Sequence, residues 1–265
     1  MTLTITPIAS SITDNWFYAI RAQSDLVLVD PIDAGRAIDF ARRSGATNVR
    51  IFVTHAHPDH TAGNDEVASS LGCAVVASRH PDFLDVPADD RVGDGDTLRI
   101  GDTQWRVLHT PGHTTGHIAL YHPGHLISGD VLFVGGTGHC RAGGEPDSLY
   151  ETFSQRITQL PDDTMFYPGH DYALRNYDFC LEVEPENNLA AERRAQAEAF
   201  YAGNPRRAPW LQTLGDERRV NPFHRTNDPA LQKALRGRLS ELWPSGEDDP
   251  ARAAFKALRR RRDTF

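Results

Sequence analysis

Four potential metal ligands stand within six residues of this chain, in the stretch THAHPDH. In extended backbone, residues i and i+2 point to the same side, so His55 and His57 can face one point just past a strand end. Pro58 then bends the chain, and Asp59 and His60 follow on the turn into the next helix. An ordinary mononuclear site does not take four ligands from one loop. The stretch therefore predicts part of each of two adjacent metal sites.

Three further side chains, each near the end of a strand-like run, complete a ligand set. His113 lies in TPGHTTGHI, where Gly112 permits a tight turn of the backbone, and His170 ends a similar run, TMFYPGH. Asp130 stands between two apolar runs in ISGDVLF, where a carboxylate is costly to bury without a cation or a hydrogen-bonding partner. Five histidines and two aspartates suit two divalent ions with one bridging carboxylate. His117 is interpreted as a supporting or packing residue.

The remaining histidines and the cysteines are weaker candidates. A single histidine is more often a hydrogen-bonded core or surface residue than a ligand, and this interpretation applies to His80, His109, His122, His125 and His224. The three cysteines are far apart in the sequence, which argues against both a disulfide framework and a CxxC metal site. A ligand set of imidazoles and carboxylates is compatible with zinc, iron or manganese.

Composition excludes several classes of protein. A net charge of -8 disfavours general nucleic-acid binding. No run approaches the ~18 apolar residues that span a bilayer, so a membrane partner is not expected. No basic residue precedes Arg21, so the start lacks the charged region of a signal peptide. We expect a cytoplasmic protein, and nothing in the sequence predicts its oligomeric state.

The pattern of elements changes about two-thirds of the way along the chain. Short β-branched and aromatic runs alternate with amphipathic helical segments in the first part, as in LVLVD, NVRIFVT and HLISGDVLFV. From about residue 172 the chain is rich in Ala, Glu and Arg and is helix-like, beginning with one long segment from LRNYDF to AFYAG. An α+β body over 1–171 followed by an all-helical unit over 172–265 is therefore predicted.

These motifs resemble the metallo-β-lactamase superfamily, whose hallmark is HxHxDH after a strand, and most closely its hydroxyacylglutathione hydrolases (glyoxalase II). The likeness extends over nearly the whole chain and includes ITDNWFYAI, LVLVDPIDAG, YPGHDYALRN and VEPENN. In the tail it includes TLGDERRVNPFHR and LRRRRDTF. The resemblance implies an αββα sandwich, two sheets faced by helices with metals at one edge, followed by a small helical C-terminal domain that binds substrate.

The resemblance also implies a ligand assignment and an activity. Carried over by position, one metal takes His55, His57 and His113, the other takes Asp59, His60 and His170, and Asp130 bridges them. The implied reaction is hydrolysis of an S-acyl glutathione thioester, such as S-lactoylglutathione, with Asp59 and a metal-bridging water as the catalytic groups. Zinc can lower the pKa of bound water to about 7, so zinc is the expected metal, with iron or manganese as alternatives.

Two groups of residues match the substrate pocket of the family. Tyr172 occupies the position of a tyrosine just after the last metal histidine. Arg259 and Arg262 match two basic residues, three apart in the final helix, that hold the glutathione carboxylate; the second is usually lysine, and arginine keeps its charge.

One loop departs from the family pattern. The family has Gly-Cys-Gly followed by a basic residue, whereas here the stretch is GGTGHCRAGG, with His139 in the basic position and Arg141 two residues later. This loop is similar to that of persulfide dioxygenases, iron enzymes of the same superfamily that act on a glutathione sulfur adduct. That resemblance implies an alternative, in which one iron is held by His55, His113 and Asp130.

Other functions fit less well. A non-enzymatic metal-binding or partner-binding protein would be expected to have a degenerate ligand set, and this one is complete. The acidic net charge weighs against a nuclease, and the glutathione-type tail weighs against both a nuclease and a lactonase. The predicted partner is a small-molecule glutathione thioester.

Overall fold

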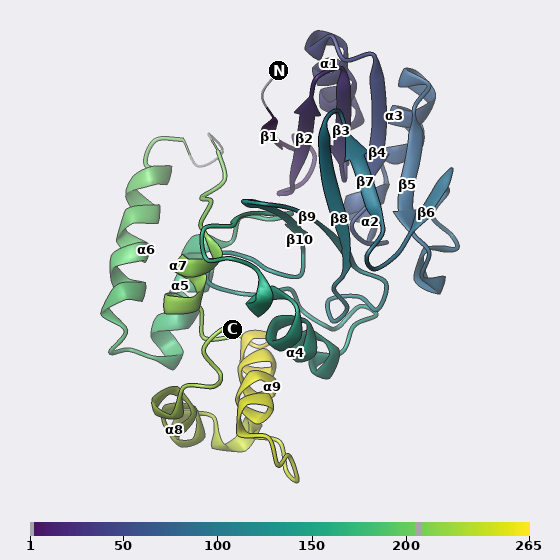
Figure 1. The fold of residues 1–265 in the computed structure, drawn as a ribbon. Coiled ribbons are helices and arrows are strands. Elements are labelled where there is room, and N and C mark those ends of the chain that lie inside the picture. The colour runs from purple at the N-terminus through teal and green to yellow at the C-terminus, as the bar shows by residue number, and fades with distance from the viewer. Residues whose placement is uncertain (1–2, 205–207) are drawn as a thin grey trace.

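Two β-sheets packed face to face form the first part of the chain in the computed structural model, which describes residues 3–204 and 208–265 (Figure 1). The first sheet has the order β1-β2-β3-β4-β5-β6, with strands β1 (Thr4–Ala9), β2 (Trp16–Ala22), β3 (Asp25–Val29), β4 (Asn48–Phe52), β5 (Ala74–Ser78) and β6 (Asp90–Val92). The second has the order β11-β10-β9-β8-β7, with strands β7 (Thr97–Ile100), β8 (Thr103–His109), β9 (Ile118–His122), β10 (His125–Gly129) and β11 (Met165–Pro168).

Parallel pairing brings several strand ends to one edge. Strands β3 to β6 pair in parallel in the first sheet, and β10 pairs with β11 in parallel in the second. Parallel neighbours end on the same side of a sheet, so the loops that follow them gather there. Six of the seven predicted ligands lie in these loops, and the seventh, His113, follows β8.

Alternation along the strands divides the body into two apolar layers. In β2, Tyr18 and Ile20 pack between the two sheets, whereas Phe17 and Ala19 pack on the outer face of the first sheet, as the two-residue period of a strand requires. Helices α1 (Ala34–Ser44) and α3 (Asn64–Leu71) cover that outer face (Figure 1).

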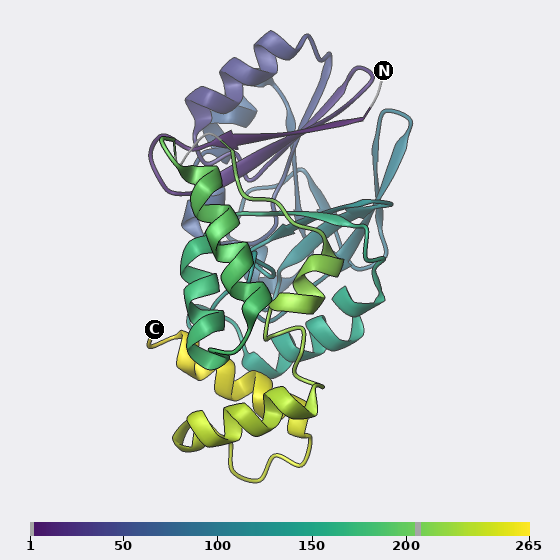
Figure 2. The ribbon, with the colours of Figure 1, turned by 90° about the vertical axis from the view of Figure 1, so that its left-hand side faces the viewer.

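The outer face of the second sheet shares its hydrophobic cluster with the C-terminal part of the chain. The helices that contribute to this cluster are α4 (Pro146–Gln155), α5 (Ala173–Val183), α6 (Asn188–Tyr201), α7 (Leu214–Val220), α8 (Pro229–Arg238) and α9 (Pro250–Arg262). Figure 2 views the molecule from the side of α5 and α6, which lie side by side. The tail is therefore packed onto the sandwich through a continuous apolar layer.

The predicted αββα sandwich with a helical tail is confirmed, but one element boundary is wrong. The strand expected over HLISGDVLFV ends at Gly129, and the apolar residues after it lie in a buried turn closed by two hydrogen bonds between Phe133 and Gly136. These residues are apolar because they pack against the tail. The helix-like segment at the start of the tail forms two helices, α5 and α6, separated where Pro185 lacks the backbone donor and Asn187 caps the second helix.

No helix within residues 3–204 and 208–265 combines the length and the hydropathy needed to cross a membrane.

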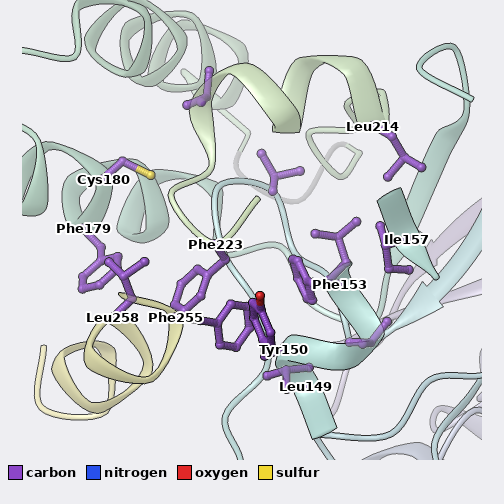
Figure 3. Close-up of a cluster of buried hydrophobic side chains, with 14 of the residues drawn as sticks. Leu149, Tyr150, Phe153, Ile157, Phe179, Cys180, Leu214, Phe223, Phe255 and Leu258 are labelled. Carbon is purple, nitrogen blue, oxygen red and sulfur yellow. The ribbon is translucent and has the colours of Figure 1, made fainter. Parts of the chain in front are cut away.

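We predict that Phe255→Ala lowers the free energy of unfolding by about 3–5 kcal/mol. Phe255 is fully buried, with ring centroids 5.2 Å from Phe223, 5.5 Å from Phe153 and 5.7 Å from Tyr150, so it joins α9 to α4 (Figure 3). Urea unfolding followed by circular dichroism measures the change, and Phe255→Leu should cost less. A wild-type midpoint for Phe255→Ala would show that the tail is not coupled to the body.

Candidate metal centre

The seven predicted ligands all lie just past strand ends at the same edge of the sandwich. His55 and His57 follow β4, Asp59 and His60 lie in the short helix α2 (Pro58–Thr61), and His113, Asp130 and His170 follow β8, β10 and β11. Backbone hydrogen bonds join the two sheets here, from Ile118 N to Thr54 O at 2.8 Å and from Trp16 N to Gly169 O at 2.8 Å. Backbone hydrogen bonds alone therefore hold the two sheets together at the edge where the ligands lie.

Three imidazoles form the first group. The Nε2 atom of His113 lies 3.2 Å from Nε2 of His55 and 3.0 Å from Nδ1 of His57, and the latter two atoms are 3.1 Å apart. Nitrogens about 2.1 Å from one tetrahedral ion would lie roughly 3.4 Å from each other. The triangle thus has nearly the dimensions that one ion requires, and the three residues form one of the clusters able to hold a metal.

The second group is formed by Asp59, His60 and His170, and Asp130 lies between the groups. His170 Nε2 is 3.3 Å from Asp59 Oδ2, and His60 Nε2 is 3.7 Å from the same oxygen. Asp130 Oδ2 lies 3.7 Å from His113 Nε2 and 3.4 Å from His170 Nε2, and its Oδ1 lies 3.5 Å from His60 Nε2. Asp130 is therefore placed as a carboxylate that can reach two ions.

Each of the five imidazoles has its outer nitrogen beside an oxygen atom. The pairs are His55 Nδ1 with Thr54 Oγ1 (3.0 Å), His57 Nε2 with Ala142 O (2.9 Å), His60 Nδ1 with Asp30 Oδ2 (2.9 Å), His113 Nδ1 with His139 O (2.7 Å) and His170 Nδ1 with Asp14 Oδ1 (3.2 Å). The first four of these partners fix ring orientation and leave the inner nitrogen to bind metal, whereas the buried Nδ1 of His170 makes no hydrogen bond with the described residues and approaches Asp14 only as an ion pair. Asp130 Oδ1 is buried and has no hydrogen-bond partner among the described residues. This donor set fits two divalent cations.

Charge at the centre supports the same conclusion. Burial alone would lower the pKa of His60, but Asp130 and Asp30 outweigh it and raise this pKa to about 10. Burial would raise the pKa of Asp130, but His170 and His60 outweigh it and hold this pKa well below its usual range. Burial lowers the pKa of His113 to about 4, against the opposing effect of Asp130. The buried carboxylates thus require positive charge beside them, which divalent cations supply.

Two important residues of the site were not predicted from the sequence. Asp30 accepts hydrogen bonds from Thr54 N (2.8 Å) and Thr54 Oγ1 (2.6 Å) in addition to its pairing with His60. Asn15 Nδ2 donates to the carbonyl oxygen of Asp59 at 3.0 Å. Asp30 has a recognisable signal, since it ends the strand-like run LVLVD just as Asp130 follows ISG. Asn15 has none of its own.

The predicted roles of the PGH loop agree with the geometry. Gly112 has a φ of 135°, and a Cβ added there would lie 2.3 Å from Leu149 Cα, so the close approach requires glycine. His117 Nε2 accepts a hydrogen bond from Asp130 N at 3.2 Å, and its Nδ1 lies 2.7 Å from Thr110 Oγ1. His117 therefore supports the backbone of Asp130 from behind.

Two of the predicted substrate residues, Tyr172 and His139, lie beside predicted metal ligands, and Arg141 does not contact one within the described residues. The Tyr172 ring stacks on His170 with centroids 5.0 Å apart and donates its hydroxyl to Asp14 Oδ2 at 3.1 Å. The His139 ring lies 5.1 Å from that of His113. Arg141, in the same loop as His139, is exposed and has its Nε 3.9 Å from Asp263 Oδ1.

The two arginines of α9 differ in their surroundings. Arg259 is only 3% exposed; its Nη1 donates to Thr137 O at 3.0 Å and Gly138 O at 3.1 Å, and its Nη2 to Asp263. Arg262 is partly buried and donates from Nη2 to Asn176 Oδ1 at 2.9 Å. Burial, with Arg175 and Arg259 nearby, lowers the pKa of Arg262 to about 10. A ligand carboxylate would meet Arg262 more readily than Arg259 in this conformation.

Comparison with known families agrees with this geometry. Residues 13–170 match the model of the metallo-beta-lactamase superfamily, and residues 171–265 match the model of the hydroxyacylglutathione hydrolase C-terminus. Fold and ligand set together define a protein of the metallo-β-lactamase superfamily.

Curated relatives narrow the assignment. The chain is 38% identical over 250 residues to a hydroxyacylglutathione hydrolase of Anaeromyxobacter dehalogenans, covering 94% of this chain and 95% of the relative. It is 36% identical over 269 residues to that of Chromohalobacter salexigens, covering 99% and 100%. The chain belongs to the hydroxyacylglutathione hydrolase family. Among solved structures, ETHE1 from Myxococcus xanthus is similar, with 25% identity, a TM-score of 0.64 and 84% of each chain covered.

We predict that Asp130→Ala lowers the bound metal from two equivalents to one or none, because both groups of ligands share this carboxylate. Elemental analysis of the purified variant measures the loss, and Asp102→Ala, which removes an exposed aspartate, is the matched control. Two tightly bound equivalents in Asp130→Ala would rule out a bridging role.

Proposed function

We propose that the chain hydrolyses S-acyl glutathione thioesters, such as S-lactoylglutathione, at a centre of two divalent cations. The observation that carries this proposal is a chain of contacts that leads from Arg262 through Asn176 and Tyr172 to His170. Arg262 binds Asn176, whose backbone N donates to Tyr172 O one turn earlier in the chain, and Tyr172 stacks on His170. The relatives named hydroxyacylglutathione hydrolase support the same substrate class.

The arginines of this region suit a carboxylate of glutathione. Arg262 makes no ion pair with any carboxylate in the described part of the chain, and Arg175 and Arg259 lie close enough to lower its pKa. A guanidinium presents a planar pair of donors that matches a carboxylate. Contacts of Tyr172, His139, Arg141 and Arg259 with the substrate belong to the same proposal.

Zinc is the metal that we propose, and an imidazole and carboxylate set also accepts iron or manganese. His55, His57 and His113 would hold one ion, Asp59, His60 and His170 the other, and Asp130 would bridge them. Divalent zinc lowers the pKa of bound water to about 7 and polarises a carbonyl, which makes hydroxide available at neutral pH.

The residues around this centre have distinct tasks in the proposed reaction. Asp59 is 41% exposed at its side chain, against 7% for Asp130 and His170, so its carboxylate can orient the attacking water. His170 is the main cause of its lowered pKa, so Asp59 stays ionised. Burial raises the pKa of Tyr172 to about 12, so its hydroxyl stays a donor. The leaving thiol has a pKa of about 8.5 and needs no dedicated acid.

The second candidate is a glutathione persulfide dioxygenase, favoured by His139 and Arg141 in the loop after Asp130. In that case one iron would be held by His55, His113 and Asp130, and the second group would have no assigned role. The convergence of Asp59, His60 and His170 into a cluster able to hold metal supports the hydrolase instead.

A paired assay distinguishes these reactions. With S-lactoylglutathione, release of glutathione is followed with a thiol reagent; with glutathione persulfide, oxygen uptake is followed with an electrode. We expect rapid thiol release and no enzyme-dependent oxygen uptake. The reverse result would contradict the hydrolase and establish the dioxygenase.

We predict that Arg262→Ala raises KM for S-lactoylglutathione about 10-fold with little change in kcat, because a charged hydrogen bond to the substrate is lost. Arg260→Ala is the matched control, since Arg260 is exposed on the same helix and binds Leu242 O. S-lactoyl-γ-glutamylcysteine, which lacks the glycine carboxylate, tells which end of glutathione is bound. Equal KM values for wild type and Arg262→Ala would remove this arginine from the substrate site.

A cytoplasmic location, the absence of nucleic-acid and membrane partners, and the domain boundary after residue 171 stay predictions.

A further inference from the structure

Side chains of the helical tail make hydrogen bonds to the backbone of every residue from 134 to 138, between β10 and α4, in addition to the two backbone bonds between Phe133 and Gly136. The side-chain contacts are Val134 O with Asn176 Nδ2 (2.8 Å), Gly135 N with Glu217 Oε2 (2.8 Å), Gly136 O with Asn221 Nδ2 (3.0 Å), and Thr137 O and Gly138 O with Arg259 Nη1 (3.0 and 3.1 Å). We call Asn176, Glu217, Asn221 and Arg259 the loop clamp. They come from three helices and the residue after α7, and all are at least 97% buried.

The residue that follows this backbone segment contacts a metal ligand. The carbonyl oxygen of His139 lies 2.7 Å from Nδ1 of His113, and this contact requires the proton of a neutral imidazole to be on Nδ1. The Nε2 lone pair then faces His55 and His57. The backbone at Gly138 packs directly against the site, because a Cβ there would lie 2.1 Å from Asp130 O and 2.8 Å from His113 Nδ1.

We propose that the loop clamp is a positioning device, which sets the orientation of the His113 imidazole and thereby the metal affinity of the site that it forms with His55 and His57. The tail then acts on the metal centre as well as on the substrate. This inference rests on the proposed metal centre and does not depend on the identity of the substrate.

Arg259 is the clamp residue that binds the carbonyl next to His139 in the chain, and most of its guanidinium donors have hydrogen-bond partners within the protein. It gives Nη1 to two loop carbonyls and Nη2 to Asp263, which leaves Nε, a buried atom without a partner among the described residues. A buried guanidinium that holds two consecutive carbonyls fixes the peptide leading into His139. His139 O is the outer partner of His113, and disturbing such a partner typically costs about 10–100-fold in metal affinity, so we expect the loss of Arg259 to fall in this range when it displaces His139.

Glu217 supports the far end of the segment. It also accepts a hydrogen bond from Asn221 Nδ2 at 2.9 Å, so two clamp residues are joined. Burial raises the pKa of Glu217 to about 8, against the opposing hydrogen bonds of Asn221 and Gly135, so its carboxyl is mainly neutral at pH 7. Glutamine has nearly the same shape as a neutral carboxyl and should preserve the contact.

The test measures metal affinity by chelator competition in the Arg259→Met variant. The matched control is Arg260→Met, which makes the same substitution at an exposed position of the same helix. We expect Arg259→Met to lose about 10–100-fold in affinity for one of two ions, to keep the other, and to lose the Nδ1–H signal of His113 in ¹⁵N spectra of the metal-free protein. Arg259→Lys should recover part of the affinity, and Arg260→Met should match wild type.

Two ions bound with wild-type affinity in Arg259→Met, with only a raised KM, would overturn the proposal and assign Arg259 to the substrate alone. If Arg259→Met does not fold, as judged by its thermal transition, Glu217→Ala and Glu217→Gln decide the question. We then expect Glu217→Ala to weaken one ion and Glu217→Gln to bind both normally. Equal affinities in this pair would also overturn it. Because no thioester is used, these outcomes are independent of the proposed reaction.

Discussion

The buried carboxylate of Asp130 lies where the two sheets meet, within 3.7 Å of imidazole nitrogens from His60, His113 and His170. A charge in such a place is stable only beside opposite charge. The imidazoles that supply this positive charge are oriented by oxygen atoms beside their outer nitrogens. Among these, the carboxylate of Asp30 binds both His60 and Thr54. These groups converge because the strands that precede them end at one shared edge of the two sheets.

The helical tail takes part in this arrangement more directly than a separate substrate-binding unit would. Its apolar residues complete the outer layer of the second sheet, with Phe255 at the contact with α4. Its buried polar residues hold the loop that ends at His139, and His139 contacts His113. Substrate recognition by Arg262 and metal positioning through Arg259 would then share one helix, three residues apart.

The sequence predicts most of the site because its ligands follow strand ends, where HxHxDH, PGH and GD motifs are short and local. Asp30 could have been found by the same rule, since it ends LVLVD. Asn15 and the loop clamp could not, because their roles depend on contacts between residues such as Glu217 and Gly135 that are 82 positions apart. The apolar run after Gly129 resembles a strand in the sequence, but its residues lie in a turn that packs in the cluster shared with the tail. An apolar run alone does not distinguish a buried strand from a buried turn.

Anomalous diffraction from a crystal of the zinc-loaded protein, recorded on both sides of the zinc edge, tests the metal centre most directly. The account predicts two peaks about 3.5–4 Å apart, one enclosed by His55, His57 and His113 and the other by Asp59, His60 and His170, with Asp130 in contact with both. A single peak held by His55, His113 and Asp130, or ligands that diverge around no ion, would contradict it.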